Sequence, residues 1–187
     1  MPRLRIVIIG DALDKQQAGV HFYLKNFLDT LEHLNLKHEI FVLRQNPSKS
    51  YRNIKEVNLR TSYFFGSRAY RLFFQIPNFI KKLNPDFVIE PSHFGPFNLP
   101  KHINRITIIH DLTPLLFPQM HVWHSQILQK VFLPFIFQKS DLIISNSKFT
   151  SSDIKKQFPF VSEKIQEVIP GRDIFFTQKK DDSILKK

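Results

Sequence analysis

The chain has 187 residues, 42% of them hydrophobic, no cysteine, and a formal net charge of +11. The hydrophobic content excludes a disordered chain, and the lack of cysteine excludes disulfides, thiolate metal sites and a cysteine nucleophile. Every apolar run falls short of the about 18 residues of a membrane span, and the first run is too short for a signal peptide. We therefore expect about one domain of a cytoplasmic protein.

Strand-like and helix-like segments alternate along the chain. Residues 4–9 form a continuous apolar run, which is typical of a strand buried on both faces of a parallel sheet. The next segment begins at Gly19 and repeats apolar residues at helical spacing as far as Leu34. Further strands are predicted at 38–43, 54–59, 86–90, 103–109, 141–145 and 164–169, and further helices at 68–83, 121–138 and 148–158. This order predicts an α/β fold, a Rossmann-like doubly wound parallel sheet.

Prolines and charges refine two of these segments. In the helix predicted at 68–83 the spacing places Arg71 on the polar face, away from the apolar residues. Pro77 is expected to kink this helix, because its ring removes a backbone donor and clashes with the preceding turn. Pro114 and Pro118 predict an extended loop after the strand at 103–109.

The loops after the strands hold the candidate functional residues, because a doubly wound sheet binds its ligand at the carboxyl ends of the strands. Gly19 opens a helix, where free amide donors attract anions and a glycine admits a ligand close to the backbone. The loop matches neither the dinucleotide-binding fingerprint nor a phosphate-binding loop. The alternative role of Gly19 is that it merely lets the chain turn. His110, before Asp111 at the exit of a predicted strand, can hydrogen-bond a sugar or a phosphate, or it can be structural.

Metal and hydrolase chemistry find little support. His121 and His124 are three residues apart near a predicted helix start, but no carboxylate pattern accompanies them, so we expect no metal site. The sequence also lacks the glycine-flanked serine elbow of the α/β-hydrolases.

The stretch Lys49 to Lys82 contains eight basic residues against the single acid Glu56. It also contains the pairs Phe64-Phe65 and Phe73-Phe74. Basic and aromatic residues together are typical of surfaces that bind nucleic acid, an anionic membrane or an anionic ligand. They are equally typical of a solvated face above core aromatics. Because no nucleic-acid reading motif accompanies the stretch, nucleic acid is the least favoured partner.

Five loop segments share a pattern. Residues 18–23 are AGVHFY, 106–121 are ITIIHDLTPLLFPQMH, 140–153 are SDLIISNSKFTSSD, and 163–173 are EKIQEVIPGRD. With Ser92-His93-Phe94, these segments resemble, in order and spacing, the loop motifs of glycosyltransferase family 4, and most closely its bacterial mannosyltransferase-like members. His21 and Phe22 stand where the family usually has Gly-Arg, so the resemblance implies no arginine contact to phosphate here.

The resemblance implies half of a GT-B enzyme, in which two Rossmann-like domains face each other across a cleft. Residues 1–176 would be the N-terminal, acceptor-side domain, and residues 177–187 a charged linker toward a C-terminal donor domain that is absent. His110 would face the transferred sugar, and Asp111 would support it. The implied substrate- and donor-binding residues are Gly19 near the donor phosphates, His93 on the acceptor side, and Val20, Ser147 and Lys148.

The family resemblance also implies the reaction. The full enzyme would transfer a sugar, mannose being one candidate, with retention from a nucleotide sugar to a glycan or lipid-linked acceptor in cell-surface polysaccharide synthesis. No metal or other cofactor is required. A lipid-linked acceptor would bring Lys49–Lys82 to an anionic membrane, so that the protein is peripheral at the inner face of the membrane. The alternative is a non-catalytic Rossmann-like module or remnant that binds a glycan, a partner or an anionic membrane surface.

Overall fold

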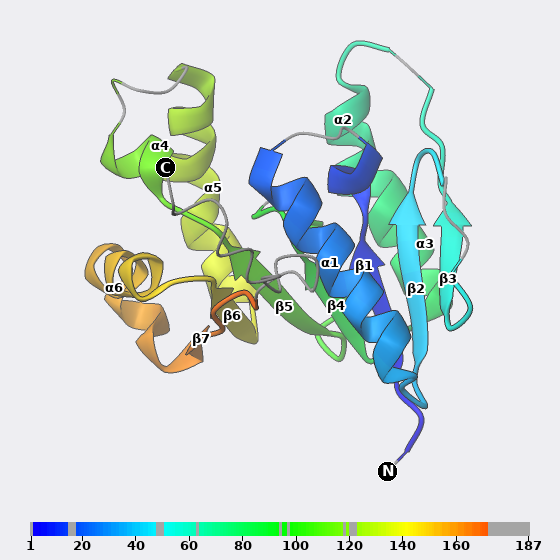
Figure 1. Cartoon of the computed structure of the whole chain (residues 1–187). Coiled ribbons are helices and arrows are strands. Elements are labelled where there is room, and N and C mark those ends of the chain that lie inside the picture. The colour runs from blue at the N-terminus through cyan, green and yellow to red at the C-terminus, as the bar shows by residue number, and fades with distance from the viewer. Residues whose placement is uncertain are drawn as a thin grey trace, which may run out of the picture.

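A single seven-stranded parallel sheet organises the molecule (Figure 1). The computed structural model describes residues 2–14, 18–47, 51–62, 64–93, 95–96, 98–117, 119 and 123–171, without the side chains of 18 and 123–128. The strands are β1 (Arg5–Ile9), β2 (Glu39–Arg44), β3 (Ile54–Asn58), β4 (Phe87–Glu90), β5 (Asn104–Ile109), β6 (Leu142–Ser145) and β7 (Ile165–Glu167). They lie in the order β3-β2-β1-β4-β5-β6-β7, and all neighbours are parallel. The α/β doubly wound fold is therefore confirmed.

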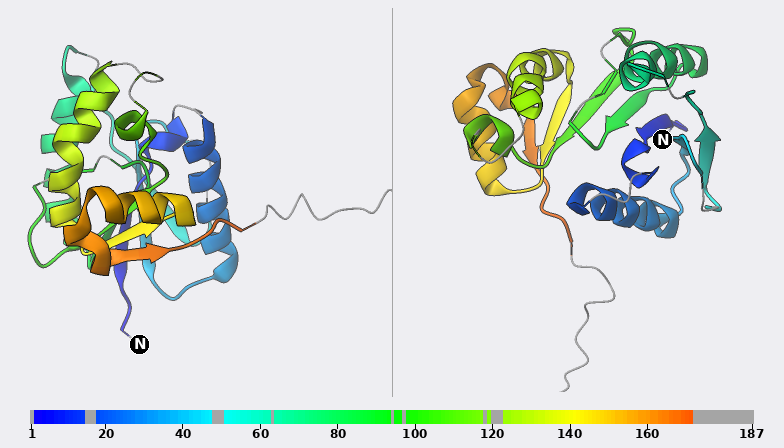
Figure 2. Two further views of the ribbon diagram at one scale, coloured as in Figure 1. Left: turned by 90° about the vertical axis from the view of Figure 1, so that its left-hand side faces the viewer. Right: turned by 90° about the horizontal axis from the view of Figure 1, so that it is seen from above.

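Helices cover both faces of the sheet. The main ones are α1 (Ala18–Leu34), α3 (Ile76–Leu83), α5 (Trp123–Lys139) and α6 (Lys148–Gln157). Because neighbouring residues of a strand point to opposite faces, Ile8 packs under α1, whereas Val7 packs under α3. Helices α5 and α6 share the α3 face, and Figure 2 shows α1 on the other side of the sheet. Within the described part of the chain, no helix is long and apolar enough to span a bilayer.

The helix predicted at 68–83 consists of three pieces: α2 (Ser67–Tyr70), the π-helical segment η2 (Arg71–Gln75) and α3. A π turn aligns residues five positions apart, and it brings Arg71 onto the same face as Ile76, where both are buried. The prediction that Arg71 lies on a polar face is therefore wrong, and its side chain is 3% exposed. Pro77 lies in the first turn of α3, where a missing donor costs least. The kink expected at Pro77 stays a prediction, because the π-helical segment ends just before this proline and the backbone at the junction is helical.

Short helical turns replace two predicted loops. The polar loop after β1 contains the 3-10 turn η1 (Asp11–Asp14), and the loop after β5 contains the short helix α4 (Thr113–Leu116). The expectation of an extended loop there is wrong, because Pro114 in the first turn of α4 needs no backbone donor. Another 3-10 turn, η4 (Pro159–Lys164), precedes β7. The predicted domain boundary at 176 and linker 177–187 lie outside the described residues.

Candidate functional site

His110 follows β5 directly, at the carboxyl edge of the sheet. Its Nε2 donates to the carbonyl oxygen of Pro91 at 2.8 Å, and because a carbonyl only accepts, the ring proton resides on Nε2. Nδ1 then accepts from the side-chain amide of Asn146 at 3.3 Å. Burial lowers the pKa of His110 more than the hydrogen bond to Pro91 and the charge of Asp111 raise it. The ring is therefore a neutral imidazole with one defined tautomer.

His93 holds the backbone of His110. The Nε2 atom of His93 accepts a hydrogen bond from the backbone N–H of His110 at 2.7 Å, so this nitrogen cannot also hold a proton. Burial, followed by the neighbouring His110, lowers the pKa of His93 to about 4. The φ angle of His93 is +67°, a left-handed conformation that few non-glycine residues adopt. The chain thus keeps a strained, neutral histidine where it anchors the end of β5.

Asp111 is bound to Thr113. Its Oδ1 accepts from the Thr113 backbone N–H at 3.0 Å and from the Thr113 hydroxyl at 2.7 Å, which stabilises the start of α4. Burial alone would raise the pKa of Asp111, but the two hydrogen bonds from Thr113, together with His93 and His110, hold the pKa below its ordinary value. Asp111 therefore supports His110 as a nearby negative charge, while its hydrogen bonds go to α4.

Ser147 connects α6 to the same histidine. Its hydroxyl accepts from the Thr150 backbone N–H at 3.1 Å, as a helix N-cap does. The Thr150 hydroxyl in turn donates to the backbone carbonyl of His110 at 3.0 Å. Ser147 thus caps the helix whose first turn holds the exit of β5.

Gly19 and Val20 lie in the first turn of α1. Gly19 is exposed, and a methyl group added there would meet open space, so packing within the described residues does not require a glycine. One turn later, the Tyr23 ring meets the His110 ring edge to face at 5.0 Å between centroids. The helix start predicted near a donor phosphate is therefore adjacent to His110.

The structure thus gathers His93, His110, Asp111 and Ser147 at one edge, with Gly19 and Val20 close by through Tyr23. Sequence reasoning missed Pro91, Tyr23, Asn146 and Thr150. Asn146 could have been predicted, because it follows β6 directly and all carboxyl ends of a parallel sheet share an edge. Tyr23 follows the same helical spacing as the apolar residues after Gly19, so the sequence alone does not set it apart from them.

Two arginine–aspartate pairs hold the turn that leads from β1 to α1. The Arg71 guanidinium binds both carboxylate oxygens of Asp11, at 2.7 and 2.5 Å, and donates to the Leu59 carbonyl. Arg44 binds Asp14 at 3.1 Å and reaches Glu56 at 2.9 Å, with both acids nearly buried. We call these contacts the paired-arginine clamp: Asp11 with Arg71, and Asp14 with Arg44. The clamp fixes the 3-10 turn η1, which follows β1.

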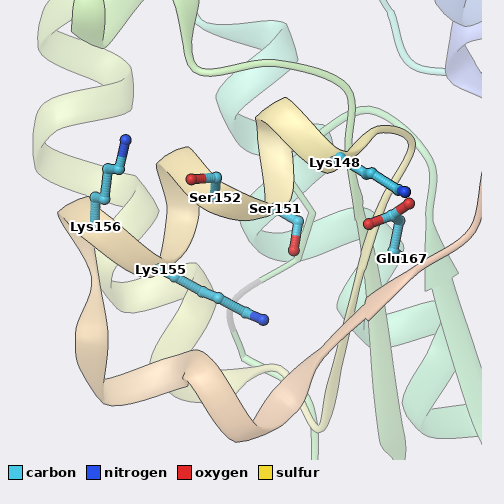
Figure 3. A pocket seen from close by; sticks show the side chains of 6 residues that line it. All are labelled: Lys148, Ser151, Ser152, Lys155, Lys156 and Glu167. Atoms are coloured by element: carbon cyan, nitrogen blue, oxygen red, sulfur yellow. The ribbon is translucent and has the colours of Figure 1, made fainter.

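Lys148 is the first residue of α6 and lines an open hollow of about 470 Å³ (Figure 3). In Figure 3 its amine and the Glu167 carboxylate point toward each other. The hollow is lined by Lys148, Ser151, Ser152, Lys155, Lys156 and Glu167, and none of the clustered histidines takes part. The structure thus places Lys148 on the outer side of α6, apart from the other site residues.

A second hollow, of about 790 Å³, lies at the start of β1 and holds Arg52 and Lys55 of the basic stretch. The predicted surface at Lys49–Lys82 is therefore divided between opposite edges of the sheet. For metals, the described residues contain no group of three acidic or histidine side chains placed to bind an ion. His121 and the side chain of His124 lie outside the described residues.

Comparison with known proteins identifies one family and several solved structures of similar fold. The model of Glycosyltransferase Family 4 matches residues 18–174. Anabaena Alr3699/HepE in complex with UDP-glucose is similar, with 14% identity and a TM-score of 0.62, over 98% of this chain and 49% of that one. Its complex with UDP and glucose gives 15% identity and a TM-score of 0.60 over the same shares. A candidate UDP-N-acetylglucosamine 2-epimerase from Listeria monocytogenes gives 10% and 0.53, over 88% and 45%.

A search of curated proteins found no match. At these identities the likeness to solved structures concerns the fold, and it confirms the expected GT-B half. The chain spans about half the length of the solved structures that it matches.

Proposed function

This chain belongs to glycosyltransferase family 4, and on that premise we propose that it is the acceptor-side domain of a retaining hexosyltransferase. The complete cytoplasmic enzyme transfers a sugar, with mannose as the first candidate, from a nucleotide sugar to a glycan or lipid-linked acceptor in cell-surface polysaccharide synthesis. The bond from the anomeric carbon to the diphosphate oxygen breaks, and a bond to the acceptor hydroxyl oxygen forms. The leaving nucleoside diphosphate accepts the hydroxyl proton.

One observation supports this proposal most directly. Within the matched segment, His110 is neutral, has a defined tautomer and lies at the edge where such sheets bind ligands. Its Nε2 is held at 2.8 Å by Pro91, whereas Nδ1 has the longer contact of 3.3 Å to Asn146. Nδ1 is thus the atom that a hydroxyl of the transferred sugar can reach as a donor. His93 positions this ring rather than meeting the sugar itself.

The donor phosphates fit the first turn of α1. The first turn of a helix leaves backbone amides without partners inside the helix, and the open space above Gly19 admits a diphosphate to the backbone. Val20 lies in the same turn. The first turn of α6, which Ser147 caps, offers a second set of amides, whereas Lys148 lies apart from this edge beside Glu167. The UDP-glucose complex of HepE, similar in fold, supports a nucleotide sugar as the donor class.

A donor domain completes the site in this proposal. GT-B catalysis needs both walls of a cleft and closure around the substrates. We therefore expect the 187-residue chain to show no transfer by itself and the protein with a following donor domain to be active.

The test uses the complete reading frame that contains this chain. The purified protein is incubated with a panel of nucleotide sugars, including GDP-mannose and UDP-glucose, and with glycan and polyprenyl-phosphate acceptors. Nucleoside diphosphate release that depends on acceptor supports the proposal, and the anomeric configuration of the product tests retention.

The matched variants are His110→Ala and His102→Ala. His102 is an exposed histidine of the loop before β5, at the opposite edge of the sheet. Loss of a hydrogen bond at the transferred sugar should lower kcat by roughly a hundredfold in the first variant and leave the second unchanged. A folded protein without turnover on any pair overturns the enzyme assignment, and glycan binding without turnover supports the non-catalytic module.

A further inference from the structure

A buried carboxylate lies at the start of the loop that holds His110. Glu90 is the last residue of β4, and its side chain is 1% exposed. Its Oε2 accepts from the Arg105 guanidinium at 2.7 Å and from the Thr107 hydroxyl at 3.2 Å. Within the described residues its Oε1 has no hydrogen-bond partner. Burying a carboxylate with one oxygen unsatisfied is costly, so a glutamate at this position needs a specific reason.

The chain folds back over this carboxylate. A methyl group added at Gly95 would overlap the carboxyl carbon and both carboxylate oxygens of Glu90, so the backbone at Gly95 packs directly against them. The chain from Glu90 to Gly95 therefore begins and ends at the same side chain. We call residues 90–93 and 95 the Glu90 loop. His93 belongs to it with its φ of +67°, and such a conformation persists only where the surrounding contacts determine it.

The Glu90 loop supplies two of the groups that hold His110. The Pro91 carbonyl accepts from Nε2 of the His110 ring at 2.8 Å, and Nε2 of His93 accepts from the His110 backbone N–H at 2.7 Å. The centroids of the two histidine rings are 5.4 Å apart. Because one loop provides both acceptors, a shift of this loop relative to β5 would weaken both hydrogen bonds together.

The ion pair between Glu90 and Arg105 fixes the loop relative to the strand that leads to His110. Arg105 belongs to β5, and the register of the sheet places Glu90 opposite Thr107 of the same strand. Strand β5 ends immediately before His110. The pair therefore connects the loop that follows β4 to the strand that carries His110, through a charge-assisted hydrogen bond that is roughly twice as strong as a neutral one.

We propose that Glu90 is a positioning residue for His110. Its carboxylate, bound to Arg105 and packed against Gly95, holds the Glu90 loop in the one arrangement in which both acceptors reach His110. Because it is buried, Glu90 contacts neither the sugar nor the reacting atoms, and it acts through the loop alone. This inference rests on the proposed function and deepens it, because it identifies the group that keeps Nδ1 of His110 directed at a sugar hydroxyl.

A second buried ion pair provides a matched comparison. Glu56 of β3 binds Arg44 at 2.9 Å, and the two side chains are 8% and 6% exposed. Arg44 ends β2, where the backbone N–H of Gly10 donates to the Leu43 carbonyl at 2.8 Å. A glutamate that only stabilises the fold would behave like Glu56, whereas a positioning residue acts specifically on His110.

The test compares Glu90→Gln with Glu56→Gln in the 187-residue chain, with no donor or acceptor present. Each change keeps the size of the side chain and removes its charge. Hydrogen–deuterium exchange followed by NMR reports on the backbone N–H groups of His110 and Gly10. In Glu90→Gln the protection of the His110 N–H should fall about tenfold more than that of Gly10, because its acceptor is no longer held in place. In Glu56→Gln the Gly10 N–H should lose more protection than that of His110.

The tautomer of His110 gives a readout that a loss of stability alone does not move. In NMR spectra of isotope-labelled histidine at neutral pH, the unchanged chain and Glu56→Gln should show the His110 ring proton on Nε2 only. Glu90→Gln should add the second tautomer, because the Pro91 carbonyl no longer stays within reach. Gly95→Ala displaces the same loop without removing a charge, so it should also add this tautomer, and it serves as the test if Glu90→Gln does not fold.

Selective loss of protection at His110, together with a second tautomer, supports the proposal. An unchanged His110 in both Glu90→Gln and Gly95→Ala overturns it, and so does the same response of His110 in Glu56→Gln, which would indicate a general loss of stability.

Activity of the complete enzyme tests the link to sugar transfer. Glu90→Gln should lower kcat about tenfold and leave KM for the nucleotide sugar within about twofold, because the ring is misplaced rather than removed. An unchanged kcat in an active enzyme overturns the proposal. The exchange and tautomer measurements involve no transfer, so an inactive unchanged enzyme would overturn the proposed function without altering their outcome.

Discussion

The two halves of the carboxyl edge are held by different chemistry. At the exits of β1 and β2, the paired-arginine clamp joins Asp11 to Arg71 and Asp14 to Arg44. At the exits of β4, β5 and β6, the contacts run through the neutral rings of His93 and His110 to backbone groups and to Asn146. The nearest buried ion pair in that half, Glu90 with Arg105, lies within the sheet below the loops.

The two halves therefore differ in role: one fixes a loop, and the other can contact a ligand. Ion pairs give the β1 turn a fixed shape, and their charges are already satisfied within the protein. Neutral imidazoles instead combine one strong hydrogen bond with a longer one, so a ring atom can change partner without leaving a charge buried. We infer that the clamp half holds its loop and that the histidine half meets the sugar. The first two predictions below separate charge from neutral hydrogen bonding, and the third compares one glycine from each half.

Removing Arg71 should have the largest effect. The Arg71→Ala change leaves the Asp11 carboxylate without its partner and the Leu59 carbonyl without its donor. Because breaking a buried pair leaves an uncompensated charge, we expect the free energy of unfolding to fall by about 3 kcal/mol. Urea unfolding followed by circular dichroism measures it. Arg68→Ala, which changes an exposed arginine three residues earlier, should stay within about 0.5 kcal/mol, and equal losses would contradict a clamp.

The histidine half should respond to pH. The folded-state pKa of His93 is about 4, below the ordinary value of about 6.5, so the unfolded chain binds the proton first. The stability that His93 contributes is therefore complete above pH of about 6.5 and is lost as the pH falls toward 4. The loss is at most about 3 kcal/mol. In the His93→Gln variant the amide oxygen can accept the same N–H without titrating, and its unfolding should lack this pH dependence. Identical pH profiles would refute a neutral His93.

Two glycines, one in each half, should differ in a smaller way. A methyl group at Gly95 would overlap the Glu90 carboxylate, which is buried and bound to Arg105 at 2.7 Å. We expect Gly95→Ala to lower the free energy of unfolding by about 1–3 kcal/mol. Gly19→Ala meets open space and should stay within about 0.5 kcal/mol, while weakening nucleotide-sugar binding in calorimetric titrations of the complete enzyme. A stability loss at Gly19 would show that packing, rather than a ligand, selects this glycine.

Much of the fold could be predicted from the sequence because its signals are local. Apolar runs such as residues 4–9 and helical spacing after Gly19 depend on neighbours along the chain, and the observed β1 and α1 agree with them within one residue. Short turns were missed where proline was interpreted as extended chain, as in α4. The π turn was missed because a single shift from four to five residues leaves no periodic signal in so short a segment.

In the candidate site, too, only the local features could be predicted from the sequence. Placing His110 at the exit of a strand needed only the strand and the rule that parallel sheets bind ligands at their carboxyl ends. Its tautomer, its anchoring by His93 and its contact with Asn146 involve residues 17 to 36 positions away. Nothing in the local sequence indicates which ring nitrogen meets which partner.

By itself, then, the sequence determined the alternation of strands and helices, the family and the edge at which His110 lies. The tertiary structure alone decided that Arg71 turns inward to Asp11, 60 residues away, while Arg68 stays in solvent. It also decided that the basic stretch is split between two edges of the sheet. The physical reason is that burial and charge pairing depend on which distant groups meet, whereas hydrophobic periodicity depends on neighbours.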